Sequence, residues 1–229
     1  MLFASGRGQV PFSQNYKVAR GNDHFSSLNG DTDVHLELDH SSGSGFESKS
    51  HLLSGLFNMK SKLPASKSPG VVTTFYLTSK GGLHDEIDFE FIGVGVGEQK
   101  FHLWFDPSTY FHSYTILWNQ YQVVFFVDNI PIRVFKNLGH RASYPTQGMQ
   151  VETIWAAKGW AGKINWSKAS FTAQYQGFDI DGCVMSNPSN PWNSDSAIPK
   201  CQDQVYDYCT DRSRYPCWIF DLLLCYLGS

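Results

Sequence analysis

The sequence predicts an all-β fold of the sandwich or jelly-roll type. Short runs of alternating or β-branched apolar residues recur along the chain, separated by Gly, Asn, Asp and Ser. Apolar residues make up 41% and aromatic residues 15% of 229 residues, enough for the core of one large all-β domain or two small ones. No convincing helical pattern occurs before residue 180, so we expect sheets alone to form the core.

The first third of the chain reads as strands broken by turns. Val34–Leu38 alternates cleanly and predicts a half-buried strand, whereas the β-branched run Val71–Leu77 is typical of a buried one. Two further strand regions are expected at 12–18 and, as a strand pair, at 53–63.

The stretch His84–Gly93 is unusual for a strand. The acids Glu86, Asp88 and Glu90 alternate with apolar residues, so three carboxylates project from one face and the apolar side chains from the other. Like charges on one strand face repel one another, and Asp and Glu are poor strand formers. A fold tolerates this arrangement where the acids face a polar cleft and act there.

The second half of the chain continues the strand pattern up to residue 178. Asp128-Asn129 predicts a hairpin turn between two of these strands. The tail, 179–229, reads as a loop-rich, Cys-containing C-terminal extension, and residues 1–11 read as the remnant of an N-terminal leader. The strands expected in this half are 100–105, 114–118, 123–127, 132–135, 149–155 and 171–178.

The acidic strand has the composition needed for glycoside hydrolysis. Cα atoms of Glu86 and Glu90 are about 13 Å apart on a strand, and their side chains can lean together toward the roughly 5–5.5 Å carboxyl separation of retaining glycosidases. One Glu would attack the anomeric carbon, the other would act as acid and then base, and Asp88 would hydrogen-bond the nucleophile. A divalent cation site and a solvated strand face are the weaker alternatives, and His84 is expected to be a structural hydrogen-bonding residue.

Charge and cysteine content narrow the class of protein further. A net charge of −3 gives no basic footprint for nucleic acid or membrane, so a neutral substrate is expected, and the abundant aromatics suit a carbohydrate groove. The five cysteines all lie in the last quarter, form no CxxC pair and have no His at zinc spacing, which predicts disulfides in an oxidising compartment and no metal. One thiol is left unpaired or pairs with another chain. The segment Met1–Gly6 is too short for the apolar part of a signal peptide.

His84–Gly93 resembles the signature of the xyloglucan endotransglucosylase/hydrolase family, plant enzymes within glycoside hydrolase family sixteen. The resemblance runs from about Phe12 to Pro216 and implies a concanavalin-like β jelly-roll with the acidic strand on its concave face. It also implies retaining cleavage of xyloglucan, transfer of the cut chain to another xyloglucan or to water, a monomer without cofactor, and secretion to the plant cell wall (apoplast). Other matching segments are Ser41–Phe46, Trp104–Pro107, Pro131–Asn137, Trp166–Lys168 and Tyr208–Pro216.

The same resemblance assigns roles to single residues. Glu86 would be the nucleophile, Glu90 the acid/base and Asp88 the helper. Substrate contacts would come from Glu90 and from a second set of residues, and Tyr76 is a further candidate for stacking. Cys183–Cys201 would be a first disulfide, Cys209 would pair with Cys217 or Cys225, and Asn165 is the one glycosylation sequon. The second set of substrate contacts comprises Glu98, Trp155, Gly159, Trp160, Gly162 and Arg214.

The chain also departs from the family pattern. The family's sequon and its Gln-Thr-Asn strand are missing after Gly93, the loop before Trp166 is short, and the end beyond Pro216 differs. Loss of that strand exposes an edge of the acidic strand. The alternatives are therefore a catalytically impaired glucan-binding splice variant or truncated product, and a mixed-linkage glucanase of the same superfamily.

Overall fold

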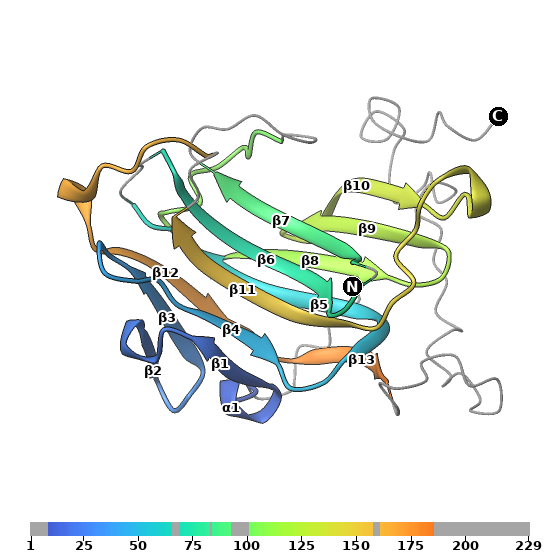
Figure 1. Cartoon of the computed structure of the whole chain (residues 1–229), viewed down its shortest axis with the longest axis horizontal. Helices are drawn as coiled ribbons and strands as arrows, with labels where there is room; N and C mark the ends of the chain where they lie inside the picture. The colour runs from blue at the N-terminus through green and yellow to red at the C-terminus, as the bar shows by residue number, and fades with distance from the viewer. Residues whose placement is uncertain (1–8, 66–68, 83, 93–100, 158–160, 186–229) are drawn as a thin grey trace.

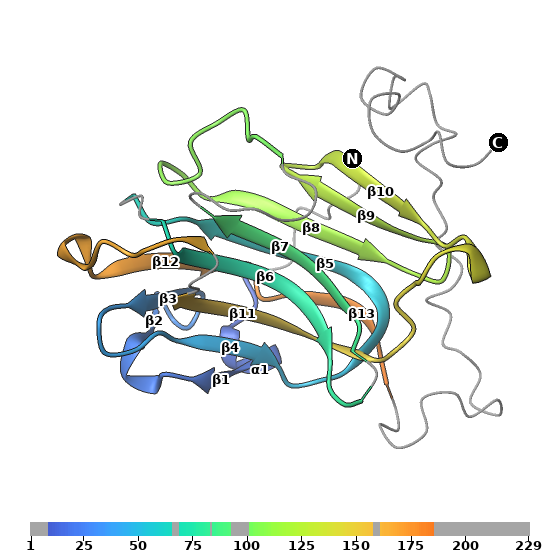
Figure 2. The same ribbon diagram turned by 45° about the horizontal axis from the view of Figure 1, so that its top comes forward.

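The computed structural model describes residues 9–65, 69–82, 84–92, 101–157 and 161–185 (Figure 1). Its strands are joined by antiparallel pairing into one sheet that folds over on itself (Figure 2). In chain order the elements are α1 (Phe12–Asn15), β1 (Tyr16–Arg20), η1 (Asn22–His24), β2 (Phe25–Leu28), β3 (Asp33–Leu38), β4 (Gly45–Ser48), β5 (Leu52–Lys62), β6 (Val71–Ser79), β7 (Glu86–Ile92), β8 (His112–Trp118), β9 (Gln122–Val127), β10 (Ile130–Lys136), η2 (Gly139–Arg141), β11 (Met149–Ala157), η4 (Trp166–Lys168), β12 (Phe171–Gln176) and β13 (Ile180–Val184).

The sheet forms two layers. The first has the strand order β1-β4-β11-β6-β7, and the second runs β2-β3-β12-β5-β8-β9-β10, with β13 paired along β5. The layers join where Met149 of β11 pairs with Leu52 of β5. In Figures 1 and 2 the first layer lies in front of the second, which makes the predicted all-β sandwich the observed fold.

The core fills the space between the layers. Phe75 and Leu77 of β6 and Val151 of β11 contribute from the first layer, and each is fully buried. Met59 of β5 and Ile116 of β8 are equally buried on the second layer. Burial of these apolar side chains is the main stabilising term of the fold, and it leaves the other face of the first layer for polar residues.

Two strand predictions and one turn prediction are confirmed, each with a physical reason. β3 shows the alternating burial expected of Val34–Leu38. All nine residues of β6 are buried, because this strand lies between β7 and β11 within the layer. Asp128 and Asn129 have φ values of 49° and 66°, the two positive angles of the tight hairpin turn that joins β9 to β10.

Three other predictions are wrong. Residues 12–15 form the helical turn α1 instead of a strand, because Phe12 packs its ring against Tyr16, Phe46 and other aromatic residues. Residues 53–63 lie in the single strand β5, followed by Leu63, instead of a strand pair. Residues 101–105 are not in a strand; instead the ring of Phe105 stacks on His112 with centroids 3.6 Å apart.

The sheet extends past residue 178. β13 pairs with β5, and a Cβ atom on Gly55 would lie 2.6 Å from the carbonyl oxygen of Asp181, so the glycine lets the two backbones approach. Within the described parts of the chain, no helix is long and apolar enough to cross a membrane.

Candidate active site

The alternation predicted for the acidic strand is present in β7. Ile87 is 5% exposed and Phe89 packs on the core, whereas Glu86 and Glu90 are exposed and Asp88 is half-buried. The three carboxylates therefore project from the face of the first layer that points away from the core. This side-by-side placement was the central prediction about the candidate site, and the structure has it.

Aromatic packing fixes β7 from the core side. The Phe89 ring lies 5.2 Å from that of Phe125, 5.6 Å from that of Tyr114 and 6.3 Å from that of Phe75, measured between centroids. Phe91 adds an edge-to-face contact with Tyr114 at 4.6 Å. Such pairs favour one geometry, so they hold both the depth and the register of the strand.

The beginning of β7 is fixed by Asp85. Its carboxylate accepts hydrogen bonds from the backbone N–H groups of Thr146 and Gln147 at 2.7 and 2.9 Å. Its own N–H donates to the hydroxyl of Ser79 at 2.8 Å. No local pattern singles out Asp85, because the partners of its carboxylate, Thr146 and Gln147, lie about sixty residues downstream. On the neighbouring exposed position, His84 Nε2 lies 3.4 Å from Oε2 of Glu86.

Only β6 pairs with β7 among the described strands. Thr78, Tyr76 and Thr74 of β6 stand opposite Glu86, Asp88 and Glu90, respectively. The outer edge of β7 is paired with no other strand in the described residues. The resemblance predicts an open edge here because of the gap after Gly93, and residues 93–100 lie outside the described residues.

A second group of polar residues continues the acidic face across the layer. The Tyr76 hydroxyl donates a 2.7 Å hydrogen bond to Oε2 of Glu152 on β11, and Lys80 contacts the other oxygen of that carboxylate. Lys80 also lies 3.4 Å from Oε2 of Glu47 on β4, whose other oxygen pairs with Lys17 of β1 at 3.0 Å. Glu152 is only 7% exposed, so it is a buried carboxylate with two partners.

Burial and neighbouring charge act in the same direction on the pKa of Tyr76 and in opposite directions on the pKa of Glu47. Burial raises the pKa of the Tyr76 hydroxyl far above its usual value, and the hydrogen bond to Glu152 raises it further. Burial alone would raise the pKa of Glu47, but the nearby ammonium groups of Lys17 and Lys80 outweigh it and hold that pKa below its usual value. The first layer therefore carries a polar row, in which the neutral Tyr76 hydroxyl lies beside carboxylates and ammonium groups. The polar row consists of Tyr76, Glu152, Lys80, Glu47 and Lys17.

The predicted substrate contacts fall partly within the described chain. Trp155 lies in β11, where it pairs with Thr73 of β6. Gly162 has φ of 110°, and a Cβ atom there would lie 2.8 Å from that of Pro69. Tyr76, a further stacking candidate, is 8% exposed, so little of its surface is open to a sugar. The predicted contacts Glu98, Gly159, Trp160 and Arg214 lie outside the described residues.

The predicted modification sites stand as follows. Cys183 is 4% exposed and takes part in a disulfide. Its predicted pairing with Cys201 lies outside the described residues, as do the predictions for Cys209, Cys217 and Cys225. Asn165 is exposed, and its side-chain oxygen accepts hydrogen bonds from the N–H and hydroxyl of Ser167 at 3.1 and 2.7 Å. Among the residues with described positions, no cluster of three or more His, Cys, Asp or Glu could hold a metal.

This geometry can carry out acid–base and nucleophilic chemistry on a neutral substrate. Glu86 and Glu90 flank Asp88 on one exposed strand face, so a bond placed over the strand would meet one carboxylate on each side. Sequence reasoning missed the supporting residues Glu152 and Lys80. They belong to segments that read as an ordinary strand and a turn, and only the sheet register brings them beside the acids.

Comparison with known proteins gives a consistent result. A model of the family described as "Glycosyl hydrolases family 16" matches residues 12–175. The chain is 47% identical to "Xyloglucan endotransglucosylase/hydrolase protein 2" of Arabidopsis thaliana, with 93% of this chain and 89% of that protein covered. It is 41% identical to "Xyloglucan endotransglucosylase/hydrolase" of Brassica oleracea var. botrytis, with 90% and 85% covered. The first alignment spans 259 positions, more than the 229 residues of this chain, so the Arabidopsis protein carries segments that this chain lacks.

Solved structures share the fold. A Bacillus licheniformis β-glucanase superimposes with a TM-score of 0.60 at 20% identity, covering 71% of this chain and 89% of that one. A prokaryotic β-1,3-1,4-glucanase (lichenase) derived from a mouse hindgut metagenome gives a TM-score of 0.59 at 23% identity, covering 72% and 91%. At these identities the likeness establishes the β jelly-roll architecture.

Proposed function

The chain belongs to glycosyl hydrolase family 16 and, within it, to the xyloglucan endotransglucosylase/hydrolases. On that premise we propose that it cuts the β-1,4-glucan backbone of xyloglucan and joins the new end to a second xyloglucan chain or to water. The observation that carries this proposal is the row Glu86, Asp88 and Glu90 on one face of β7. We further propose that the protein acts in the plant cell wall as a secreted monomer, with oligosaccharides as alternative acceptors.

The reaction proceeds in two displacements at the anomeric carbon. A carboxylate oxygen of Glu86 forms a bond to that carbon while the glycosidic C–O bond breaks, and Glu90 gives its proton to the departing oxygen. Glu90, now a carboxylate, then removes the proton of an acceptor hydroxyl as the new C–O bond forms, and Glu86 is released. Asp88 hydrogen-bonds the nucleophile and fixes its rotamer.

The balance between transfer and hydrolysis depends on which acceptor reaches the glycosyl-enzyme first. A sugar held beside the intermediate has an effective concentration that offsets the abundance of water. Trp155 of β11 and Trp160 are proposed as acceptor platforms, with Gly162, Gly159, Glu98 and Arg214 as the remaining substrate contacts.

Turnover of xyloglucan with labelled oligosaccharide acceptors tests the proposal. The parent chain should form labelled polymer, Glu86→Ala should form none, and Glu90→Gln should lower kcat about 10²–10⁴-fold. Added azide should restore cleavage to Glu86→Ala, because a small anion can replace the missing nucleophile. Asp181→Asn removes an exposed carboxylate on β13 and is the matched control.

Three results would contradict the proposal in different ways. Binding of xyloglucan without turnover by the parent chain would support the catalytically impaired variant. Preferential cleavage of barley-type mixed-linkage glucan would support a glucanase. Turnover that is equal in the parent and in Glu86→Ala would remove Glu86 from the mechanism.

A further inference from the structure

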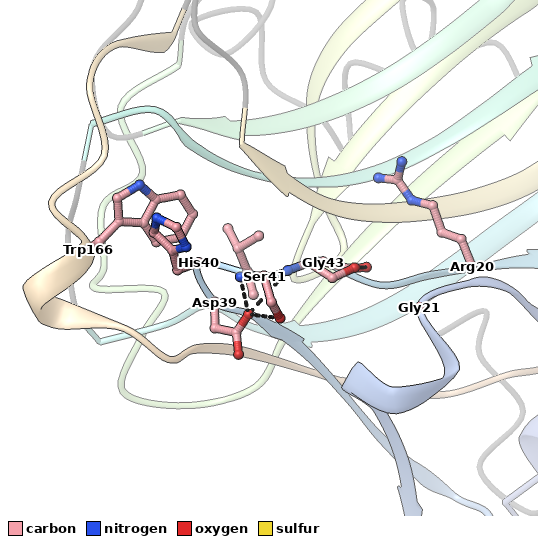
Figure 3. Close-up of a pocket in the computed structure, with 9 residues that line it drawn as sticks. Arg20, Gly21, Asp39, His40, Ser41, Gly43 and Trp166 are labelled. Atoms are coloured by element: carbon pink, nitrogen blue, oxygen red, sulfur yellow. Dashed lines mark hydrogen bonds between the residues drawn. The ribbon is translucent and has the colours of Figure 1, made fainter.

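A pocket of about 310 Å³ lies at the end of the molecule where β1, the loop between β3 and β4, and η4 meet (Figure 3). His40 and Trp166 lie together on one side of it, Arg20 lies on the other, and Asp39 and Ser41 lie between them. Leu38 contributes a buried apolar side chain to the lining. This volume is at the lower end of the range for small-ligand pockets, which suits a single sugar ring.

The wall of the pocket is held by hydrogen bonds and by close backbone packing. One Asp39 carboxylate oxygen, Oδ1, accepts hydrogen bonds from the N–H and hydroxyl of Ser41 at 2.7 and 2.6 Å and from the N–H of Ser42 at 3.1 Å. His24 Nε2 lies 3.0 Å from the same oxygen. At Gly21, a Cβ atom would lie 2.3 Å from the carbonyl oxygen of Gly43, so the two backbones are packed directly together. The pocket therefore exists before a ligand arrives.

Its polar groups retain unused hydrogen-bonding capacity. Within the described part of the chain, the exposed guanidinium of Arg20 makes no hydrogen bond or ion pair, although it offers five N–H donors. The second carboxylate oxygen of Asp39, Oδ2, likewise makes no hydrogen bond with a described residue. The His40 and Trp166 rings pack edge to face with centroids 5.6 Å apart, and the centroid of the Trp166 ring also lies 6.5 Å from that of Phe171.

This combination selects a neutral ligand with many hydroxyl groups. An anion drawn to Arg20 would meet the carboxylate of Asp39, and a cation drawn to Asp39 would meet the guanidinium. A sugar hydroxyl both donates and accepts, so neighbouring hydroxyls can use both groups at once. The apolar face of the ring would lie against the aromatic side formed by His40 and Trp166.

A series of paired strands leads across the first layer from the pocket to the acids of β7. Arg20 pairs with Gly45 of β4, which pairs with Ile154 of β11. The N–H of Ile154 donates a 2.9 Å hydrogen bond to the Thr74 hydroxyl on β6, and Thr74 stands opposite Glu90. Four strand spacings separate β1 from β7, about 19 Å. The charge of Arg20 acts on the Tyr76 hydroxyl, where it opposes the rise in pKa that burial and the Glu152 and Glu86 carboxylates produce.

We propose that the Arg20–Trp166 pocket is a distal sugar subsite, which binds one residue of a glucan chain lying across the strands of the first layer while the bond to be cut lies over β7. The inference rests on the proposed function for the identity of the chain that is bound. It adds to that function a specificity for long substrates, because a short oligosaccharide placed over β7 would not reach β1.

A double variant separates this subsite from the catalytic strand. Arg20→Ala/His40→Ala should raise KM for polymeric xyloglucan about tenfold, as expected for the loss of about 1.4 kcal/mol of hydrogen bonding and stacking, with kcat unchanged. Turnover of a short oligosaccharide donor should be unchanged. His140→Ala/Arg141→Ala removes the same residue types from the exposed turn η2 at the opposite end of the molecule in Figure 1, and should match the parent.

A binding measurement keeps the subsite distinguishable from the activity. In calorimetric titrations of the Glu86→Ala protein with xyloglucan, adding Arg20→Ala/His40→Ala should weaken Kd about tenfold, and adding the η2 pair should not. If the parent chain turns over xyloglucan and the pocket variants equal the η2 control in KM and Kd, the subsite is refuted and the proposed function stands. If the parent is inactive but the pocket variants weaken binding, the proposed function fails and the subsite stands. Absence of any xyloglucan binding would refute both.

Discussion

The hydroxyl of Tyr76 donates a 2.7 Å hydrogen bond to Oε2 of Glu152, and the same tyrosine stands opposite Asp88 on the other side of its strand. One buried phenol therefore links the acidic strand β7 to the buried carboxylate of β11. The link lies within the sheet, so its contribution can be measured without touching a residue proposed to react.

Tyr76→Phe should lower the free energy of unfolding by about 1–2 kcal/mol, because Glu152 loses a neutral donor and keeps Lys80 as its partner among the described residues. Urea denaturation of Tyr76→Phe measures this loss. Tyr110→Phe, at a position that is 75% exposed, is the control and should match the parent. Equal stability of Tyr76→Phe and the parent would mean that the hydrogen bond does not contribute.

Phe89→Ala should destabilise the protein by about 3 kcal/mol, because it removes a ring in contact with Phe75, Tyr114 and Phe125 and leaves a cavity beneath the acids. Activity should fall more than the folded fraction, since β7 loses the packing that sets its register. Phe89→Leu should recover much of both. Leu28→Ala, at a 44% exposed position, serves as the control. Full activity in folded Phe89→Ala would show that the packing does not set the register.

Gly21→Ala and Gly30→Ala form a matched pair. Their φ values are +66° and +68°, but only at Gly21 would the new Cβ atom meet another atom, the Gly43 carbonyl oxygen at 2.3 Å. Both substitutions incur the left-handed backbone penalty of about 1–2 kcal/mol. Gly21→Ala should cost a further 1–3 kcal/mol, roughly the penalty of overpacking, and should loosen the pocket wall. Thermal unfolding of both variants measures the difference, and equal losses would show that the close approach is relaxed at little cost.

The ion pairs of His24 predict a pH dependence of stability. Hydrogen bonds to Asp23 and then to Asp39 raise the pKa of His24, whose two ring nitrogens lie 3.2 and 3.0 Å from these carboxylates. Hydrogen bonds from Ser41 hold the pKa of Asp39 far below its usual value. The contribution of His24 is complete below its unfolded pKa of about 6.5 and is lost as pH rises through its higher folded pKa. The contribution of Asp39 is present above about pH 4 and is lost as pH falls.

His24→Gln should therefore lower Tm at pH 5.5 more than at pH 8.5, since the parent alone loses this stabilisation between the two. The effect should be small, as for other partly exposed ion pairs. His140→Gln, an exposed histidine without such partners among the described residues, should lower Tm equally little at both pH values. An equal loss of Tm at both pH values in His24→Gln would contradict the assignment.

Periodicity was sufficient to predict most strands because burial in a two-layer sheet imposes it locally. The alternation in Val34–Leu38 follows from a strand with one buried face. The β-branched run Val71–Leu77 follows from a strand with both faces buried. The failures arose where distant contacts override the local pattern. The turn at Phe12 is held by aromatic rings from other strands, and Phe105 stacks on His112 instead of pairing in a sheet.

The acids of the candidate site were visible in the sequence because three like charges alternate within one strand. Their supporting residues were not. Glu152 and Arg20 each look unremarkable in their own segments, and their positions depend on register between strands that lie far apart in the chain. Pairing register is set by the whole fold, so no local pattern could reveal the polar row or the distal pocket.

Among the described strands β7 pairs only with β6, and this one-sided pairing has a consequence for heat inactivation. A strand held by one neighbour can detach at a smaller free-energy cost than the inner strands, which must break two ladders. Xyloglucan turnover should then disappear several degrees below the melting of the sheet as a whole and return on cooling. Activity followed together with near-ultraviolet circular dichroism during a slow temperature ramp would resolve the two events, and coincident transitions would mean that β7 unfolds only with the rest of the molecule.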